Sequence, residues 1–456
     1  MVKQPLAVLG RSILLCLLCA AALSCKDDTF QFVFQALIVD GDDGNPVAGT
    51  DADTLRIEIA QGELPVREFE FPISDGEFDA EIELASLSSL TRLRIQMEGP
   101  TTDLITAPPW FVPSASEGFL RVVAGAPSSC TAVSFNTMEA PRAEFGMVPS
   151  GTFALAVGGT TADDEQVEFF DELEWDSRLF DADFSLSFLG PTRAATVGEG
   201  QILVLPTEAA PFIFNMLDAS DRITQVVLHS GAGPESALVS VPGLGAMVIG
   251  GEAGGAARAG VSLVELDGVV TSLQLSEPRA GAVAAALGED VLVVGGNAEG
   301  NAEILLAGST VGQPIDGVID GVRDGGLLIG DGESRALLIG GADADGAVRQ
   351  ATLRFDGCPG SCVSSAGPLW STARLRAILP EYSALIIGGE DSQSVEEARW
   401  SGDTVAIEPV VDMVLPRASA GAIVYESGAF VVAGGESGGA VLDDFEFCVP
   451  SALTPL

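Results

Sequence analysis

Apolar runs that end in a pair of glycines recur along most of this chain of 456 residues. Each run is an almost unbroken series of Ala, Val, Leu, Ile, Met or Phe, which predicts a strand that is buried on both faces. The glycine pair fits a sharp turn, because a residue without a Cβ adopts conformations that other residues avoid. Six copies are present: ALAVGG ending at Gly159, AMVIGG at Gly251, VLVVGG at Gly296, ALLIGG at Gly341, ALIIGG at Gly389 and FVVAGG at Gly435.

The spacing of these copies reveals a seventh unit. The first glycines of the pairs stand at 158, 250, 295, 340, 388 and 434, so the gaps are 92, 45, 45, 48 and 46 residues. The double gap predicts a further strand near residue 204, where QILVLP ends at Pro206 without the glycine pair. Regular spacing of this length is the signature of a repeat architecture.

Other elements recur around the glycine-pair strands. A third strand is expected after each pair, as in VEFFD from Val167 and VEEARW from Val395, and a weaker fourth strand follows, as in TVAIEP from Thr404. A short basic element precedes several copies: PRAEFG from Pro141, PTRAAT from Pro191, PRAGAV from Pro278 and PRASAG from Pro416.

This combination of a basic start, an apolar strand ending in Gly-Gly, a third strand and a fourth resembles the kelch repeat over residues 130–448. The resemblance implies an all-β, seven-bladed kelch-like β-propeller, because a four-stranded blade cannot bury both of its faces alone and radial packing buries them all. The tryptophan common in the fourth strand of kelch repeats is mostly absent, since the chain has four tryptophans. We expect the propeller to occupy residues 127–456.

Residues 29–126 show a different pattern, in which apolar and polar residues alternate. TLRIEIA, VREFEFPI, GEFDAEIEL and LTRLRIQM each read as a half-buried strand. The opening LIVDGDDGNPVAG resembles the first hairpin of bacterial immunoglobulin-like and carboxypeptidase-regulatory-like sandwiches. We therefore expect a small β-sandwich before the propeller.

One acidic loop in that opening raises the question of calcium. Asp40, Asp42, Asp43 and Asn45 supply clustered oxygen atoms, which calcium prefers. The same residues with Pro46 are ordinary turn chemistry, and no glutamate stands at the spacing of an EF-hand loop. We expect no other cofactor and no metal site.

The first residues have the pattern of an export signal. Lys3 and Arg11 precede an uncharged apolar run over residues 12–23, which is too short to remain as a membrane-spanning helix. We therefore expect a signal peptide over residues 1–24.

The sequence ALSC at the end of this signal resembles a bacterial lipobox, in which the cysteine is lipidated. Cys25 is then the lipid-attachment residue, and residues 25–28 are the lipidated N-terminus. Ala22 stands where a lipobox usually has leucine, so cleavage by an ordinary signal peptidase is the alternative.

The charge of the chain narrows its partners. It carries 22 basic and 65 acidic residues, a formal net charge of −43. Such a surface repels phosphate backbones and anionic headgroups, so we expect no nucleic-acid partner and no membrane contact besides the lipid anchor. Cations and basic partners fit this field, and acidity that only maintains solubility is the alternative.

Four cysteines remain after the signal and the lipidated residue are set aside, and an even number in an exported protein implies disulfides. Cys358 and Cys362 flank Pro359-Gly360, so we expect them to pair across a turn. Cys130 and Cys448 stand at the corresponding strand positions of the last unit, which lacks a fourth strand of its own. We expect TAVSF from Thr131 to supply that strand and the two cysteines to bond. A zinc site is disfavoured because the chain has one histidine.

Kelch-like propellers include copper-dependent sugar oxidases, sugar-ring isomerases and recognition modules, so the fold does not choose among them. The copper site of those oxidases uses two histidines and two tyrosines, whereas this chain has only His229, Tyr382 and Tyr425. A Ser-His-Asp mechanism would need the same single histidine. We expect His229 to be structural and copper chemistry to be absent.

Basic and acidic residues are expected on one face of the propeller, where loops between second and third strands meet the connections that lead into first strands. Each arginine there either braces its own blade or joins the others in an open pocket. The candidate binding face comprises Arg142, Arg279, Arg323, Arg376, Arg417, Asp343 and Asp345.

The leading hypothesis is a non-catalytic cell-envelope lipoprotein, a monomer, whose propeller recognises a protein or glycan partner. An outer-membrane or cell-surface position fits better than the inner membrane. The alternative is a periplasmic carbohydrate-active enzyme, similar to a sugar isomerase, that uses an arginine and carboxylate pocket.

The lipid anchor is directly testable. Replacing Cys25 with serine removes the acylated residue, so Cys25→Ser should move the protein from the membrane fraction to the soluble fraction after cell lysis. Several acyl chains are needed for stable anchoring, which makes the loss nearly complete. Immunoblotting of the two fractions measures this, with Ser24→Ala as the control. A Cys25→Ser protein that stays in the membrane fraction to the same degree contradicts the anchor.

Overall fold

The computed structural model describes residues 30–32, 35–39, 50–62, 64–74, 82–84, 91–106, 119–133, 137–150, 153–160, 167–171, 176–179, 190–207, 209–216, 223–228, 235–297, 300–315, 324–343, 345–370, 374, 376–381, 383–390 and 392–451. The predicted signal peptide, Cys25 and the acidic loop at residues 40–45 lie outside these ranges. Every regular element within them is a β-strand, which confirms the predicted all-β class. This part of the chain has no helix with the length and apolar character needed to cross a membrane.

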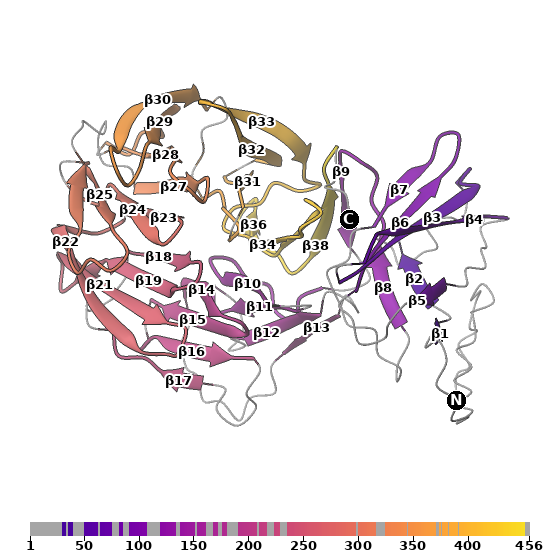
Figure 1. The fold of residues 1–456 in the computed structure, drawn as a ribbon, viewed down its shortest axis with the longest axis horizontal. Helices are drawn as coiled ribbons and strands as arrows, with labels where there is room; N and C mark the ends of the chain where they lie inside the picture. The colour runs from indigo at the N-terminus through magenta and orange to yellow at the C-terminus, as the bar shows by residue number, and fades with distance from the viewer. Residues whose placement is uncertain are drawn as a thin grey trace.

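Three sheets form from residues 30–123, at the indigo and violet end of Figure 1. The largest has the strand order β4-β3-β6-β7, built from β3 (Thr54–Gln61), β4 (Arg67–Pro72), β6 (Thr91–Glu98) and β7 (Asp103–Ile105). The two smaller sheets pair β1 (Phe30–Phe32) with β5 (Ile82–Leu84) and, in parallel, β2 (Gln35–Val39) with β8 (Phe119–Val123).

The two central strands of the larger sheet follow the alternation seen in the sequence. Leu55, Ile57 and Ile59 of β3 are buried, and the residues between them are partly exposed. On the neighbouring strand β6, Leu93, Ile95 and Met97 are buried in the same way. A period of two places alternate side chains on opposite faces, so this sheet buries one face and leaves the other partly exposed to solvent.

The remaining strands form seven larger antiparallel sheets, which we number 1 to 7 in chain order. Sheet 1 contains β10 (Gly146–Ser150), β11 (Phe153–Val157), β12 (Val167–Asp171) and β13 (Asp176–Leu179). Sheet 2 contains β14 (Thr192–Gly198), β15 (Gln201–Pro206), β16 (Phe212–Asn215) and β17 (Ile223–Gln225). Sheet 3 contains β18 (Ser236–Val241), β19 (Gly245–Gly250), β20 (Glu252–Ala253), β21 (Ala256–Glu265) and β22 (Val270–Arg279). Sheet 4 contains β23 (Val283–Leu287), β24 (Asp290–Val294), β25 (Ala302–Leu305) and β26 (Gln313–Ile315).

Sheets 5 to 7 complete the series. Sheet 5 contains β27 (Asp324–Gly330), β28 (Ala336–Ala342), β29 (Ala351–Asp356) and β30 (Val363–Leu369). Sheet 6 contains β31 (Leu385–Ile387), β32 (Ser394–Ser401) and β33 (Thr404–Asp412), with Ile378 bridged to Ile387 beside them. Sheet 7 contains β34 (Gly421–Val424), β35 (Phe430–Ala433), β38 (Phe445–Val449) and β9 (Ser129–Val133), and a small hairpin pairs β36 (Glu436–Ser437) with β37 (Ala440–Val441).

The fourth strand of sheet 7 comes from far upstream in the chain. Strand β9 precedes sheet 1 in the sequence, yet it pairs with β38 near the C-terminus, with Thr131 opposite Phe447. The pairing confirms the prediction that TAVSF completes the last unit. The first and last parts of this repeat region are therefore held together by a strand ladder (Figure 1).

The second strands are buried on both faces, as their continuous apolar sequences predict. In β11, Leu155 and Val157 pack in a cluster with sheet 2, while Ala154 and Ala156 pack in a cluster with sheet 7. Alternation along a strand sends successive side chains to opposite sides, so each sheet needs a packed neighbour on either side.

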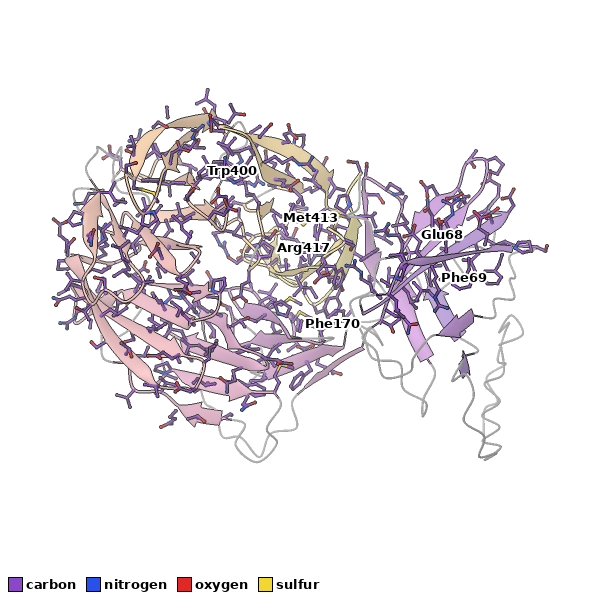
Figure 2. All side chains as sticks on the ribbon, in the orientation of Figure 1. Glu68, Phe69, Phe170, Trp400, Met413 and Arg417 are labelled. Carbon is purple, nitrogen blue, oxygen red and sulfur yellow. A yellow bond between two sulfur atoms is a disulfide. The ribbon has the colours of Figure 1, made fainter. Side chains whose placement is uncertain are left out.

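These shared clusters link the seven sheets in sequence. Separate clusters join sheets 1 and 2, 2 and 3, 3 and 4, 4 and 5, 5 and 6, and 6 and 7. A further cluster joins sheet 7 back to sheet 1 and includes Phe170, which is labelled in Figure 2. The rings of Phe170 and Phe445 stack with their centroids 4.7 Å apart.

The glycine pairs make the turns predicted for them. Both members of every pair have positive φ, for example 55° at Gly434 and 93° at Gly435. A Cβ at Gly434 would also come within 2.6 Å of the carbonyl oxygen of Arg142. Only glycine satisfies both conditions at this position.

Both predicted disulfides are present. Cys130 bonds to Cys448 with their Cα atoms 4.0 Å apart, and Cys358 bonds to Cys362 with theirs 4.2 Å apart. The first bond joins β9 to β38 at the point where the ends of the repeat region meet. Its partners are 318 residues apart in sequence, whereas the second pair are four apart.

The two disulfides should differ in their effect on stability. In the chain-entropy description a cross-link stabilises by restricting the unfolded chain, and more so for a longer loop. The double variant Cys130→Ala/Cys448→Ala should lower the free energy of unfolding by about 5 kcal/mol, and Cys358→Ser/Cys362→Ser by only about 2 kcal/mol. Denaturant unfolding followed by tryptophan fluorescence measures both. Equal losses in the two variants would mean that loop length does not decide the contribution.

Candidate functional site

A buried arginine fixes the glycine-pair turn in sheet 1. The guanidinium of Arg142 donates to the carbonyl oxygen of Gly158 at 3.1 Å and to the Glu168 carboxylate on β12 at 2.9 Å. Arg142 and Glu168 are both completely buried. The opposite charges compensate each other where water is absent, which a single buried charge would not allow.

We call this arrangement, in which one buried arginine joins the glycine turn to a glutamate of the third strand, an arginine bracket. It recurs in three other sheets. Arg279 donates to Gly295 at 2.6 Å and to Glu303 at 2.6 Å. Arg417 donates to Gly434 at 2.7 Å and to Glu446 at 2.8 Å, and it lies among the buried side chains of this region (Figure 2). In sheet 6, Arg374 donates to Glu396 at 2.9 Å and to the carbonyl oxygen of Gly388.

The carboxylates of these brackets also hold the chain that leads into the arginine. Glu168 accepts from the backbone N–H of Glu139 at 2.7 Å, and Glu303 accepts from that of Ser276 at 2.6 Å. One oxygen of Glu446 accepts from Val414 N–H at 2.6 Å. Each glutamate therefore ties the third strand, the glycine turn and the incoming connection together.

Sheets 3 and 5 carry uncharged residues at the matching position of the third strand. Ser262 pairs with Val248, and Leu353 pairs with Leu338, as Glu168 pairs with Ala156 in sheet 1. The third unit also lacks the arginine in sequence. Among the described residues, a glutamate therefore occupies this position in the sheets that also have a buried bracket arginine, whose charge it balances.

The predicted binding face is corrected for three of its arginines. Arg142 and Arg279 are 0% exposed and Arg417 is 1% exposed, so their side chains cannot reach a ligand on an open face. Their backbones do meet the glycine-pair turns, since Gly435 N–H donates to the carbonyl oxygen of Arg142 at 2.8 Å. The bracing alternative describes these residues, and the open-pocket alternative does not.

Two further arginines of that set are Arg376 and Arg323. Arg374, rather than Arg376, forms the bracket of sheet 6. Arg376 instead joins sheets 6 and 7, since it donates to Glu436 at 2.6 Å and to the Ser419 hydroxyl at 3.1 Å. The hydrogen bond to Glu436 raises the pKa of the Arg376 guanidinium. Arg323, like His229, lies outside the described residues.

The two predicted aspartates form a turn between β28 and β29. The Asp343 carboxylate accepts from the backbone N–H groups of Asp345 at 3.0 Å and Ala347 at 2.9 Å, and it pairs with Arg349 at 3.2 Å. The Ala347 hydrogen bond is the main reason why the pKa of Asp343 is lowered. These contacts satisfy the turn itself and are not directed at the arginines described above.

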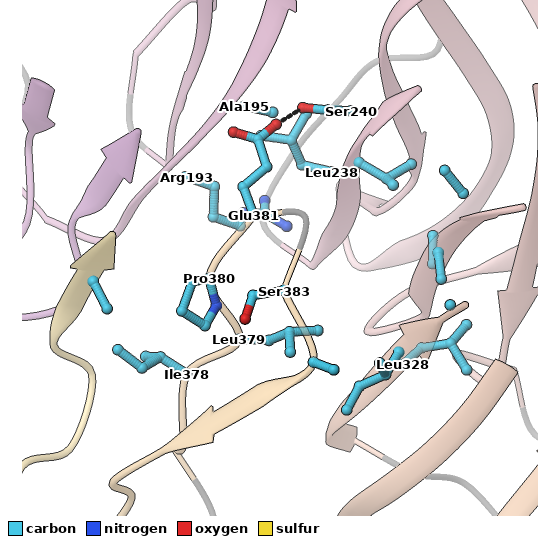
Figure 3. Close-up of a pocket in the computed structure, with 18 of the residues that line it drawn as sticks. Arg193, Ala195, Leu238, Ser240, Leu328, Ile378, Leu379, Pro380, Glu381 and Ser383 are labelled. Atoms are coloured by element: carbon cyan, nitrogen blue, oxygen red, sulfur yellow. Dashed lines mark hydrogen bonds between the residues drawn. The ribbon is translucent and has the colours of Figure 1, made fainter. Parts of the chain in front are cut away.

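A cavity of about 770 Å³ lies among the first strands of the sheets (Figure 3). Its wall takes residues from β10, β14, β18, β23, β27 and β34 and, next to sheet 6, residues 378–381, 383 and 384. Alanine and glycine form much of this wall, which leaves room that larger side chains would fill. The polar and charged lining residues are Thr192, Arg193, Ser240, Asp331, Arg335, Glu381 and Ser383.

Glu381 links the sheet 6 side of the cavity to sheets 2 and 3. Its carboxylate accepts from the backbone N–H of Thr196 at 3.1 Å and from the Thr196 hydroxyl at 2.8 Å. The Ser240 hydroxyl donates to the same carboxylate (Figure 3). Sheet 6 lacks a long first strand, and an irregular segment that carries Glu381 takes its place within the described residues.

The two arginines of the cavity differ in their surroundings. Arg335 pairs with Asp331 at 2.6 Å, and its guanidinium lies 4.8 Å from the centroid of the Trp400 ring. Arg193, at the start of β14, makes no ion pair or hydrogen bond with the described residues. Burial lowers the pKa of its guanidinium, and the charge of Glu235 opposes that effect.

Metal binding finds little support among the described residues. The one cluster there with suitable spacing combines Cys130, Glu446 and Cys448. Both sulfurs of that cluster are in the disulfide, so they cannot act as thiolate ligands.

The sequence interpretation missed the glutamates and the cavity carboxylate. A signal for the glutamates existed, because the third strands VEFFD, AEIL, VEEARW and FEFC each place a glutamate directly after a residue that reads as buried, at Glu168, Glu303, Glu396 and Glu446. A charge at a position that reads as buried requires a partner of opposite charge. No comparable signal marked Glu381, whose partners are 185 and 141 residues away.

No protein-family model matches the chain, and no curated protein matches it either. Among solved structures, the one named "Structure of YjhT" is similar over 70% of this chain and 98% of that chain, with 11% sequence identity and a TM-score of 0.43. A likeness this weak supports neither a fold assignment nor a function.

The arginine brackets predict a measurable coupling. Removing one charge from a buried pair leaves the other without compensation, so Arg279→Met and Glu303→Leu should each lower the free energy of unfolding by about 3–5 kcal/mol. The double variant should lose clearly less than the sum of the two. Denaturant unfolding of the four proteins gives the coupling energy, and Arg258→Met, an exposed site, is the control. Additive losses would contradict the bracket.

Proposed function

We propose that this protein is a non-catalytic, lipid-anchored cell-envelope protein that recognises a glycan in the cavity described above. The observation that carries the proposal is the cavity itself, which is about 770 Å³ in volume and lined by small residues with a few polar groups. Pockets for small ligands have volumes of about 300–1,000 Å³ and a small number of placed polar groups.

The proposal includes a seven-bladed β-propeller of the kelch type. Seven sheets share clusters in chain order, and a cluster between sheets 7 and 1 supports closure of the ring. Strand β9 and the Cys130–Cys448 disulfide support the same closure. In a propeller the first strands surround a central channel, which is where ligands reach all the blades at once. The sheets of residues 30–123 would then form the sandwich that joins the propeller to the lipid anchor.

A catalytic role has one specific observation in its favour. Arg193 and Glu381 line the same cavity, where a carboxylate base and a cation would both face a bound sugar. Glu381 already accepts hydrogen bonds from Thr196 and Ser240, which holds its carboxylate in place on the cavity wall. These bonds favour a recognition role, and the sugar-isomerase-like enzyme remains the second candidate.

Filling the cavity tests glycan recognition. Ala286 lies on the wall in β23, so Ala286→Trp should reduce glycan binding at least about 10-fold by occupying the ligand's space. The detergent-solubilised full chain is screened on a glycan array, and each hit is measured by calorimetry. Ala440→Trp, on the exposed β36–β37 hairpin, is the matched control and should bind as the unmodified protein does.

Each result of this screen has a distinct meaning. Glycan binding that Ala286→Trp leaves unchanged would place recognition outside the cavity. A protein partner captured without any glycan hit would replace the glycan proposal by a protein-binding one. A change in the NMR spectrum of a bound sugar over time, indicating conversion to another isomer, would favour the enzyme.

A further inference from the structure

Sheet 2 departs from the arginine bracket at every one of its positions. In sheets 3, 6 and 7, the second glycine of the pair donates to the carbonyl oxygen of the bracket arginine in the next sheet: Gly251 to Arg279, Gly389 to Arg417 and Gly435 to Arg142. The corresponding bond from Gly159 reaches Gly190 at 3.1 Å. Gly190 therefore stands where the bracket arginine would be.

The partners of that arginine are absent from sheet 2 as well. Leu205 and Pro206 take the place of the glycine pair. Register places Ile213 where sheet 1 has Glu168, because Leu203 pairs with Ile213 as Ala156 pairs with Glu168. Because the glycine pair, the glutamate and the arginine are all replaced, sheet 2 lacks the glycine turn and the carboxylate that a guanidinium at the bracket position would contact.

The arginine of this unit stands three residues further on, at the cavity. Arg193 pairs with Leu205, as Ser236 pairs with Gly250 in sheet 3 and Gly326 with Gly340 in sheet 5. The sequence placed PTRAAT among the bracket elements, and the structure corrects that alignment. Small residues occupy the equivalent positions in sheets 4, 6 and 7, namely Ala282, Ala377 and Ala420.

Arg193 thus carries a charge where sheets 3 to 7 carry a small side chain and sheet 1 carries Phe145. It lies on the cavity wall, partly buried, and forms neither an ion pair nor a hydrogen bond with the described residues. Burying an arginine without a partner costs free energy, and no bracket or turn needs this one. A ligand that brings the missing negative charge would remove that cost.

The cavity carboxylate does not supply this charge. The Glu381 carboxylate accepts hydrogen bonds from Thr196. Thr196 follows Arg193 by three residues, which separates the two backbones by roughly 10 Å along the strand. The carboxylate whose charge acts on the pKa of Arg193 is Glu235 instead. Figure 3 shows Arg193 and Glu381 on the same side of the cavity, with the Glu381 carboxylate turned toward Ser240.

We infer that the cavity takes a small carboxylate-bearing ligand whose carboxylate pairs with Arg193. A guanidinium offers two parallel N–H donors that match a carboxylate, which makes such a pair stronger and more specific than a neutral hydrogen bond. The inference rests on the proposed function in that both place the ligand in this cavity. It adds that an acidic sugar is bound in preference to its neutral counterpart.

The acidity of the whole protein does not prevent this pairing. The formal net charge of −43 is spread along the whole chain. Ionic strength near that of a cell screens exposed charges beyond about 8 Å, while a partly buried pair is screened much less. The local guanidinium therefore decides which ligand charge is accepted within the cavity.

Titration with matched ligands tests the inference. Glucuronate, glucose and cyclohexanecarboxylate are titrated separately into the detergent-solubilised full chain and followed by calorimetry. Glucuronate should bind at least about 10-fold more tightly than glucose, because a charge-assisted hydrogen bond is lost with the neutral sugar. Arg193→Ala should remove this preference, and Arg193→Lys should keep part of it.

The variants are chosen so that folding does not obscure the result. Alanine is the natural residue at the equivalent positions of three sheets, so Arg193→Ala is expected to fold, and its thermal midpoint is measured alongside binding. Arg258→Ala removes the same charge from an exposed site on β21 and should leave the preference unchanged. An equal loss in both variants would show that only net charge matters and would overturn the inference.

The ligands separate this inference from the proposed function. Glucose and glucuronate binding with equal affinity would overturn the inference and leave glycan recognition standing. Cyclohexanecarboxylate binding that depends on Arg193, without binding of either sugar, would support the carboxylate site and contradict the glycan. Binding of none of the three ligands would contradict the carboxylate site, and the glycan array then decides the proposed function by itself.

Discussion

Burial of the second strands on both faces is the constraint on which the rest of this structure depends. A strand such as β11 sends Leu155 and Val157 one way and Ala154 and Ala156 the other, so it is stable only between two other sheets. Each sheet meets this demand by packing on the units before and after it. Among the described residues no repeat precedes sheet 1 and none follows sheet 7, and these two sheets pack on each other.

The ends of the repeat region follow from the same constraint. A C-terminal sheet with three strands would expose the edge of β38, and exposed edges invite pairing with other chains. Strand β9 covers that edge, and the Cys130–Cys448 disulfide lies within the pairing. A contact made between residues more than 300 positions apart then couples the stability of the first sheet to that of the last.

The sequence was sufficient for features that are written in one strand or at one spacing. The glycine pairs, the apolar runs, the strand from Thr131 and both disulfides follow from position and residue type, and each is observed. The contacts of the arginine side chains were harder to predict from the sequence, because an arginine before a glycine pair is compatible with an open binding face or with a buried bracket. Burial of Glu168 and its equivalents decided between them, and burial depends on packing that no single unit reveals.

Departures from the repeat are where the candidate site arises. A repeat unit is selected first for its bracket, turn and packing, so residues that follow the pattern are explained by structure alone. Sheet 2 has lost its bracket and holds Arg193 at the cavity, and sheet 6 replaces a long first strand by the segment with Glu381. The two departures lie on different sheets, yet both side chains line one cavity, and Thr196 of sheet 2 binds Glu381 of sheet 6. Independent drift in two units would not be expected to place both changes on the same wall, whereas a shared ligand gives a reason for both.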